Sequence, residues 1–328
     1  MKSRVLAIAI NVIGFAAAVA VAVAAGLYFE ARPGQVPNPD AHAGPPLLAD
    51  LGVYEPTSPA SYSGVQEFAR LVGHRPQIAV YYSSWWEPFQ TAFAQAAHRN
   101  LATPMIQIEP RGVSLAAIAA GQYDSYLSAY ARAVRSFGHA VIISFGHEMN
   151  ADWYGWGYRH TSPAVFVAAW RHIHNLFAAD RAADVTWLWT VNVTGGPQVT
   201  SISQWWPGAA YVTWVGVDGH YFDPSIRFPQ LFGATLSQVR RLTRDPVLIA
   251  ESGIAPDVAI SRITDLFAGA QAHGLLGVVW FDVQGHNARI EGDPAAIATF
   301  EHAVSRYCEP ANIGSGTTAV AYLEGARR

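Results

Sequence analysis

Two glutamates of this chain lie at the ends of apolar runs, where paired acids could cleave a bond. Glu148 follows the run Val141–Phe145 and is itself followed by a tryptophan-rich patch, whereas Glu251 directly follows Pro246–Ala250. Two carboxyl groups on either side of a glycosidic bond, one protonated and one ionised, are the usual machinery for its hydrolysis. We therefore expect these acids to face each other across a bound saccharide.

The surroundings of the two glutamates predict different protonation states. Trp153 and Trp156 would remove water from Glu148 and disfavour its charged form, so we assign Glu148 as the acid and, in a second step, the base. Glu251 is followed by a serine and a glycine, whose hydroxyl or backbone groups could keep it ionised, and this favours the role of nucleophile. For either glutamate alone, the alternative is a structural role, such as capping a helix or pairing with an arginine.

Eight short apolar runs could place these acids. Segments with helical spacing lie between most of the runs, such as 123–137 and 163–177, and the second opens with the capping residues Ser162 and Pro163. The runs are Leu51–Tyr54, Ile78–Tyr82, Pro104–Ile108, Val141–Phe145, Val185–Val191, Trp214–Val217, Val247–Ala250 and Val278–Phe281. Alternating strands and helices indicate an α/β fold with a parallel sheet, and eight units favour a closed (β/α)8 TIM barrel over an open doubly wound sheet.

In such a barrel, the active site forms at the carboxyl ends of the strands. Glu148 follows the fourth predicted strand and Glu251 ends the seventh, so both would reach one cleft although they lie far apart in the chain.

Composition and the chain ends bound the function further. With 21 basic and 24 acidic residues the chain carries a net charge of -3 and has no basic stripe, so we expect no binding to nucleic acid. Residues 1–30 are predicted to be a signal peptide or membrane anchor, 31–46 a linker rich in Pro and Gly, 47–308 the barrel and 309–328 a tail. We expect an exported monomer that is extracellular or anchored at the outer face of the membrane through residues 1–30.

Several motifs between residues 51 and 305 carry a resemblance to a known family. They are Ile108-Glu109-Pro110, Ala120-Gly121-Gln122-Tyr123-Asp124-Ser125-Tyr126, Gly146-His147-Glu148-Met149-Asn150, Trp153-Tyr154-Gly155-Trp156-Gly157, Ala169-Trp170-Arg171-His172-Ile173-His174, Val185-Thr186-Trp187-Leu188-Trp189, Trp206-Pro207-Gly208, Gly216-Val217-Asp218-Gly219, Ile249-Ala250-Glu251 and Val279-Trp280-Phe281. With these motifs the chain resembles glycoside hydrolase family 26, whose barrel enzymes of clan A cut β-linked mannans and, in some members, mixed-linkage β-glucans or β-xylans.

The resemblance implies a role for five residues. Glu148 matches the acid/base and Glu251 the nucleophile, which agrees with the assignment from their surroundings. His147 would contact the substrate or orient Glu148, with a hydrogen-bonded core histidine as the alternative. Trp153 matches an aromatic ring that stacks on the leaving-side sugar, and Trp280 matches the platform under the sugar being cleaved.

The chain departs from the family pattern at two places. Where the family carries a tyrosine that donates a hydrogen bond to the nucleophile, this chain has His220, followed by Tyr221. Both are candidate binding residues, although the alternation of side chains along a strand prevents Tyr221 from simply replacing its neighbour. After the last strand, Asn287-Ala288-Arg289 lacks the family's tryptophan, so a wall of one sugar-binding subsite would be missing.

The expected function is that of a retaining endo-β-glycanase that cuts β-1,4-mannan through two glutamates. The alternatives are a β-1,3-1,4-glucanase, an exopolysaccharide-processing hydrolase, and a barrel that binds or assembles glycans without turnover. This chemistry requires no cofactor and no metal. The tempting pair His172 and His174 lies two residues apart on a predicted helix and points in different directions, so a shared metal is not expected.

Overall fold

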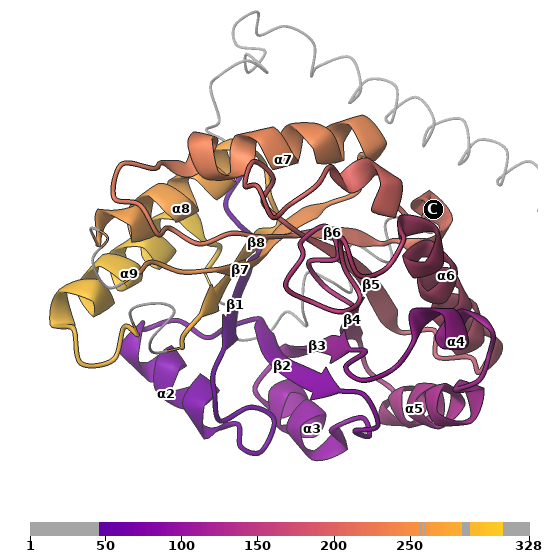
Figure 1. Cartoon of the computed structure of the whole chain (residues 1–328). Coiled ribbons are helices and arrows are strands. Elements are labelled where there is room, and N and C mark those ends of the chain that lie inside the picture. The colour runs from indigo at the N-terminus through magenta and orange to yellow at the C-terminus, as the bar shows by residue number, and fades with distance from the viewer. Residues whose placement is uncertain (1–45, 256–257, 259, 284–288, 311–328) are drawn as a thin grey trace, which may run out of the picture. The chain divides into compact units, whose positions relative to one another are not determined.

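The computed structural model describes residues 46–255, 258, 260–283 and 289–310, which contain a closed barrel of eight parallel strands (Figure 1). The strands follow one another in chain order, and β1 pairs with β8 to close the barrel. They are β1 (Asp50–Tyr54), β2 (Ile78–Ser84), β3 (Thr103–Glu109), β4 (Val141–Phe145), β5 (Val185–Asn192), β6 (Trp214–Asp218), β7 (Val247–Ser252) and β8 (Gly277–Phe281). The predicted (β/α)8 barrel is confirmed, and each strand end lies within two residues of the predicted one.

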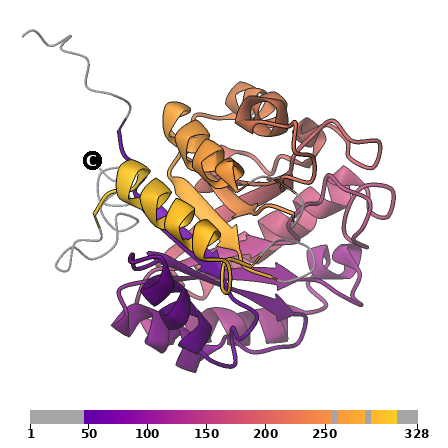
Figure 2. The same ribbon diagram turned by 90° about the vertical axis from the view of Figure 1, so that its left-hand side faces the viewer.

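Helices cover the outside of the barrel, and Figure 2 shows α8 and α9 side by side on its surface. The α-helices are α2 (Ser63–Leu71), α3 (Thr91–Arg99), α4 (Leu115–Ala119), α5 (Asp124–Phe137), α6 (Pro163–Ala179), α7 (Phe228–Leu242), α8 (Ser261–Ala272) and α9 (Pro294–Tyr307). Two short 3-10 helices, η1 (Ile202–Trp205) and η2 (Ala209–Tyr211), lie between β5 and β6.

Helix α6 shows how the local sequence sets the boundary of an element. The side chain of Ser162 accepts a hydrogen bond from the backbone N–H of Val165 at 3.4 Å, and Pro163 takes a first-turn position, where a backbone N–H has no partner within the helix. Phe166 and Trp170 are buried on the face that packs on the barrel. The cap and the apolar face together begin the helix where the sequence predicts.

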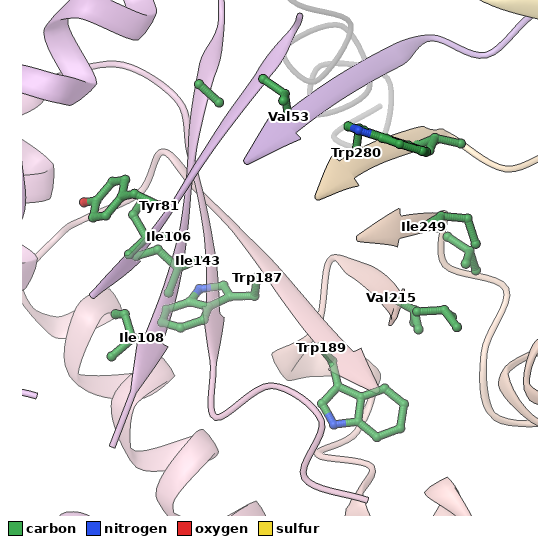
Figure 3. Packing of buried hydrophobic residues seen from close by; sticks show 14 of the residues in the cluster. Val53, Tyr81, Ile106, Ile108, Ile143, Trp187, Trp189, Val215, Ile249 and Trp280 are labelled. Atoms are coloured by element: carbon green, nitrogen blue, oxygen red, sulfur yellow. The ribbon is translucent and has the colours of Figure 1, made fainter. Parts of the chain in front are cut away.

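Side chains alternate along each strand, so the strands carry two apolar layers. The layer inside the barrel contains Ile78, Val80, Met105, Ile142, Leu188, Trp214, Leu248, Ala250 and Val279. A larger layer lies between the strands and the helices, and Figure 3 shows part of it, including Tyr81, Ile143 and Trp280. Because Val279 faces the barrel interior, the adjacent Trp280 faces the helices.

The predicted terminal segments fall almost entirely outside the described residues. These are the signal peptide or anchor at 1–30, most of the linker at 31–46 and most of the tail at 309–328, so their assignments stay predictions. Within the described residues, none of the helices combines the length and the apolar character needed to cross a bilayer.

Candidate active site

Glu148 lies three residues beyond β4, in a sharp turn of the backbone. Gly146 and Glu148 adopt positive φ angles of 56° and 55°, a region that is costly for a glutamate. The backbone N–H of Glu148 donates to the carbonyl of Thr190 in β5 at 2.9 Å, which holds the turn against the neighbouring strand. Strain of this kind persists only where the surrounding structure enforces it, and here it sets the direction of an acidic side chain.

The carboxyl group of Glu148 is buried and accepts hydrogen bonds from two neutral donors. Trp153 Nε1 donates to one oxygen at 2.6 Å, and Asn192 Nδ2 donates to the other at 2.5 Å. Asn192 is held in turn by Asn150, whose side chain bonds both its backbone N–H and its carbonyl at 2.9 Å. The pKa of Glu148 is raised to about 7, chiefly by burial and then by the charge of Glu251. The hydrogen bonds from Asn192 and Trp153 lower the pKa and offset part of this rise. Glu148 is therefore protonated in mildly acidic solution, as an acid catalyst must be.

Glu251 lies in β7 and has different neighbours. Tyr82 Oη in β2 donates to one carboxylate oxygen, and His220 Nε2 donates to the other at 3.0 Å. Burial by itself would raise the pKa of Glu251, but the hydrogen bond and charge of His220 and the hydrogen bond from Tyr82 outweigh it, so the pKa lies below its ordinary value. The pKa values of the two glutamates are therefore shifted in opposite directions, which is the pattern that the assignment of acid and anion requires.

Both glutamates line one cavity of about 940 Å³ at the carboxyl ends of the strands. Trp153 and His220 line it as well, together with Phe281, the last residue of β8. The structure thus brings the two candidate acids to the same space, with two of the predicted substrate-binding residues beside them.

His147 lies behind the cavity wall. Its side chain is buried, its Nε2 lies 3.2 Å from Tyr154 Oη, and its backbone carbonyl accepts a hydrogen bond from Trp156 Nε1 at 2.8 Å. Burial lowers the pKa of His147 and so favours the neutral ring. Tyr154 lines the cavity and His147 does not. We therefore infer that His147 positions Tyr154, and that Tyr154 is the candidate for direct contact with a substrate.

Tyr221 and Trp280 need correction as candidate contacts, because neither ring reaches the cavity. Tyr221 is fully buried on the opposite side of the chain from His220, and its hydroxyl donates to Asp265 at 3.2 Å. Trp280 is fully buried in the outer apolar layer, with its ring edge-on to Phe300 of α9 at 5.2 Å. Strand alternation directs both residues away from the site, and an aromatic ring at the end of β8 is supplied instead by Phe281.

Sequence reasoning missed the residues that hold the two acids. Tyr82 lies at the end of a predicted strand, and Asn192 stands in a segment that reads as an ordinary loop. Asp218, at the end of β6, is fully buried, and its carboxyl oxygens accept no hydrogen bond from any described residue. Burial, and then the charges of Glu251 and Glu148, raises the pKa of Asp218 well above its ordinary value, so it is neutral. Polar residues at the carboxyl ends of buried strands were the available signal for all three.

Among the described residues, one group of three carboxylates is close enough to hold a metal. Carboxylate oxygens of Glu55, Asp282 and Glu291 lie within 4.8 Å of one another where β1 meets β8. Arg289 already occupies this group, because its Nη2 donates to Glu291 at 2.5 Å and to Glu55 at 3.3 Å. The guanidinium supplies the countercharge that a cation would bring, so we assign this cluster a structural role at the closure of the barrel.

Comparison with known proteins adds sequence relatives. The sequence model of glycosyl hydrolase family 26 matches residues 114–259. Endoglucanase H of Acetivibrio thermocellus is 26% identical over 273 residues, which cover 77% of this chain and 30% of that protein. Mannan endo-1,4-beta-mannosidase A and B of Caldalkalibacillus mannanilyticus is 28% identical over 94 residues, which cover 26% of this chain and 18% of that protein. The matches therefore span less than a third of the length of either relative.

Solved structures share the fold. An endo-beta-1,4-mannanase double mutant from Cellulomonas fimi superposes with a TM-score of 0.66 at 13% identity, covering 82% of this chain and 73% of that one. A beta-mannanase from Bacteroides ovatus gives a TM-score of 0.63 at 13% identity, covering 82% of this chain and 92% of that one. Taken with the two glutamates that follow β4 and end β7, the family model and the sequence relatives support an assignment of the chain to glycosyl hydrolase family 26, and the solved structures share its barrel fold.

Proposed function

We propose that the protein is a glycoside hydrolase that cuts β-linked polysaccharide internally and with retention of configuration. The observation that carries this proposal is that the pKa values of two glutamates in one cavity are shifted in opposite directions. The pKa of Glu148 is raised to about 7, whereas the pKa of Glu251 is lowered. One carboxyl group that keeps its proton and one that has lost it are the two groups that retaining hydrolysis needs.

In the first step of the proposed reaction, Glu251 attacks the anomeric carbon while Glu148 gives its proton to the departing glycosidic oxygen. The product is a sugar bonded covalently to Glu251, and the leaving saccharide carries a new hydroxyl group. Once Glu251 is esterified, its negative charge no longer raises the pKa of Glu148. Glu148 can then act as the base that takes a proton from water, and the water oxygen replaces Glu251 on the sugar.

His220 and Tyr82 support this division of labour through their hydrogen bonds to Glu251. Both bonds stabilise the carboxylate before attack, and the same donors stabilise it again when the intermediate breaks down. In this chain, therefore, a tyrosine from β2 and a histidine after β6 share the donor role that the family resemblance assigns to a single tyrosine.

We take β-1,4-mannan as the first substrate. Support comes from the names of one curated relative and of several structural neighbours, which are mannanases. A β-glucan is the second candidate, because the relative that matches most of this chain is named an endoglucanase. A barrel that only binds glycan is disfavoured, because mere binding gives no reason to keep one buried carboxyl group protonated and the other ionised.

The proposed location is outside the cytoplasmic membrane, as a monomer that is either secreted or tethered through residues 1–30. This part of the proposal rests on the uncharged run Val5–Phe29 and the preceding Lys2 and Arg4 alone.

The test is hydrolysis of a panel of β-mannan, β-1,4-glucan, mixed-linkage β-glucan and β-xylan, measured as reducing ends released. We expect turnover of mannan or glucan by the wild-type protein and none by Glu251→Ala. The first product observed by NMR should be the β-anomer, as retention requires. Binding of the polymers without any release of reducing ends would contradict the proposal, and a first product in the α-configuration would overturn the retaining mechanism.

A further inference from the structure

Four aliphatic side chains line the cavity that holds the two acids, and we call them its apolar wall. Val193 and Val199 come from the segment after β5, Ile226 precedes α7, and Leu231 lies in α7. Phe222, with 58% of its surface exposed, lines the cavity as well, and its ring stacks on that of His220 with the ring centroids 5.7 Å apart. Five apolar side chains therefore line the same cavity as the two carboxyl groups.

The wall is attached directly to the turn that carries the acid. Residues 198–200 run alongside residues 150–152, with a bridge between Val199 and Ala151. The backbone N–H of Asp152 donates to the carbonyl of Gln198 at 3.1 Å, and the backbone N–H of Thr200 donates to the carbonyl of Asn150 at 2.8 Å. Because Glu148 must face the oxygen of the leaving group, we assign the segment of Val199, which is paired with its turn, to the leaving-group side of the cavity.

Thr194 and Gln230 are the polar side chains next to these apolar residues in the lining, and Thr194 is engaged within the protein. Thr194 donates its backbone N–H to Thr235 Oγ1 at 2.7 Å, and its hydroxyl accepts a hydrogen bond from Gln238 Nε2 at 2.9 Å. Both partners lie on α7, so the segment after β5 is fixed to the helix that supplies Leu231. The wall is preformed, and the hydroxyl of Thr194 points to protein partners.

A bare sugar fits such a wall poorly. Each sugar hydroxyl that leaves water needs a new hydrogen-bond partner, and aliphatic side chains provide none. An apolar group attached to the sugar has the opposite preference, because its transfer from water to an aliphatic surface is favourable. The wall therefore discriminates in favour of a leaving group that carries hydrocarbon.

We propose that the leaving-group side of this cleft binds a saccharide with an apolar substituent. The substituent is either an acyl ester on a ring hydroxyl or an alkyl chain at the reducing end, and both present hydrocarbon to the same wall. This inference rests on the proposed function, because it takes Glu148 as the acid that faces the leaving group.

The first experiment compares matched substrates. One pair is the methyl and the octyl β-glycoside of the same β-1,4-linked oligosaccharide, and the other is an acetylated mannan before and after mild alkaline deacetylation. We expect kcat/KM to be about tenfold higher for the substituted member of at least one pair, and the pair that shows the preference identifies the source of the hydrocarbon. Equal values within both pairs would overturn the proposal.

Binding to Glu251→Ala separates this inference from the proposed function. Titration calorimetry of the octyl and methyl glycosides and of acetylated and deacetylated mannan oligosaccharides with this variant needs no turnover. Tighter binding of a substituted ligand supports the apolar wall even if the wild-type protein hydrolyses nothing. Equal binding within both pairs contradicts the wall while leaving hydrolysis itself intact.

The paired variants Val199→Thr and Leu231→Asn, combined in one protein, test the residues. Both changes keep the approximate size of the side chain and add polar groups to the wall, so the ratio of kcat/KM for substituted over unsubstituted substrate should fall about tenfold. Leu101→Asn is the matched control, because Leu101 is 36% exposed at the end of α3, outside the cavity, at a φ of 59° that asparagine tolerates. An unchanged ratio in the double variant, with melting temperature preserved, would refute the assignment of the wall.

Discussion

The surroundings of Glu148 and of Glu251 differ in the kind of donor that each offers to a carboxyl group. Glu148 receives hydrogen bonds from an indole and an amide, which are neutral, and it feels the charge of Glu251. Glu251 receives them from a tyrosine hydroxyl and from His220, which adds positive charge. Both groups are buried, so burial alone cannot separate their pKa values.

Two residues of the same type therefore take different protonation states through their neighbours. At Glu148, two neutral donors only partly offset burial and the charge of Glu251. At Glu251, the hydrogen bond and charge of His220 together with the hydrogen bond from Tyr82 outweigh burial. Besides burial, Glu251 of β7 raises the pKa of Glu148, and His220 after β6 is the partner that lowers the pKa of Glu251 most. The barrel makes this possible because it brings the ends of separate strands to one place.

The largest effect is expected from removal of the anion. Glu251→Ala should lower kcat on polymer by about 10⁴-fold, because no group remains to attack the anomeric carbon. Added azide should restore turnover and give the α-glycosyl azide, because the small anion fits the space left by the carboxylate. Activity within tenfold of the wild-type protein would show that Glu251 is not the nucleophile.

Removal of the acid should have an effect that depends on the leaving group. Glu148→Ala should lower kcat about 10³-fold on polymer, whose leaving oxygen needs a proton. On a dinitrophenyl β-glycoside, which leaves without a proton, the first step should proceed nearly unimpaired and release a burst of dinitrophenol. Equal losses on both substrates, with no burst, would remove Glu148 from the role of acid.

The raised pKa of Glu148 also predicts a dependence of stability on pH. Its pKa is 4.5 when exposed and about 7 in the fold, so the stabilisation due to its protonated form is complete below pH 4.5 and is lost as the pH rises through 7. Glu148→Gln cannot ionise and escapes this loss. Urea unfolding measures the difference in the free energy of unfolding between Glu148→Gln and the wild type. This difference should shift in favour of the variant by about 3 kcal/mol between pH 4.5 and pH 8.5. A difference that stays constant with pH would mean that burial does not raise the pKa of Glu148.

The donors to Glu251 should set the acid side of the pH profile. In the wild-type protein, kcat/KM should decrease at acidic pH as Glu251 takes up a proton, and because the pKa of Glu251 is lowered this decrease should be centred below pH 4.5. At alkaline pH, kcat/KM should decrease again above about pH 7 as Glu148 ionises. Tyr82→Phe removes a hydrogen bond to the carboxylate and should move the acid limb up by about one pH unit. Tyr221→Phe removes the same hydroxyl from a tyrosine that bonds Asp265 instead, so its acid limb should stay in place.

The smallest change is expected at Trp153. Trp153→Phe keeps an aromatic ring at the cavity but removes the N–H that donates to Glu148. Loss of that donor should raise the pKa of Glu148, so the alkaline limb of the profile should move up by about 0.5 pH unit. A downward shift would indicate that the indole N–H favours the protonated acid.

The strands were predictable because each one is buried on both faces. Val141–Phe145 and its counterparts read as continuous apolar runs, which is typical of parallel strands covered by helices. The two catalytic candidates were predictable for a related reason, since an acid that directly follows such a run lies at the carboxyl end of a barrel strand. Tyr82 and Asn192 could not be found in this way, because a tyrosine or asparagine at a strand end becomes significant only when a carboxyl group from another strand lies beside it.

The errors at Tyr221 and Trp280 have a geometric origin. Both residues adjoin a residue that lines the cavity, and the alternation of side chains turns them to the other side of the chain. Between β6 and β7, and again between β7 and β8, the register shifts, so sequence position alone does not say which of two adjacent aromatic residues faces the cleft.

The sequence by itself determined the (β/α)8 barrel and the strand ends at which Glu148 and Glu251 stand, because burial and strand length are local properties of the chain. Only the tertiary structure decided which groups separate the pKa values of the two acids. Besides burial, the charge of Glu251 raises the pKa of Glu148, whereas His220 and Tyr82 lower the pKa of Glu251. Tyr82 and His220 lie 169 and 31 residues away from Glu251 and meet it only when the barrel closes.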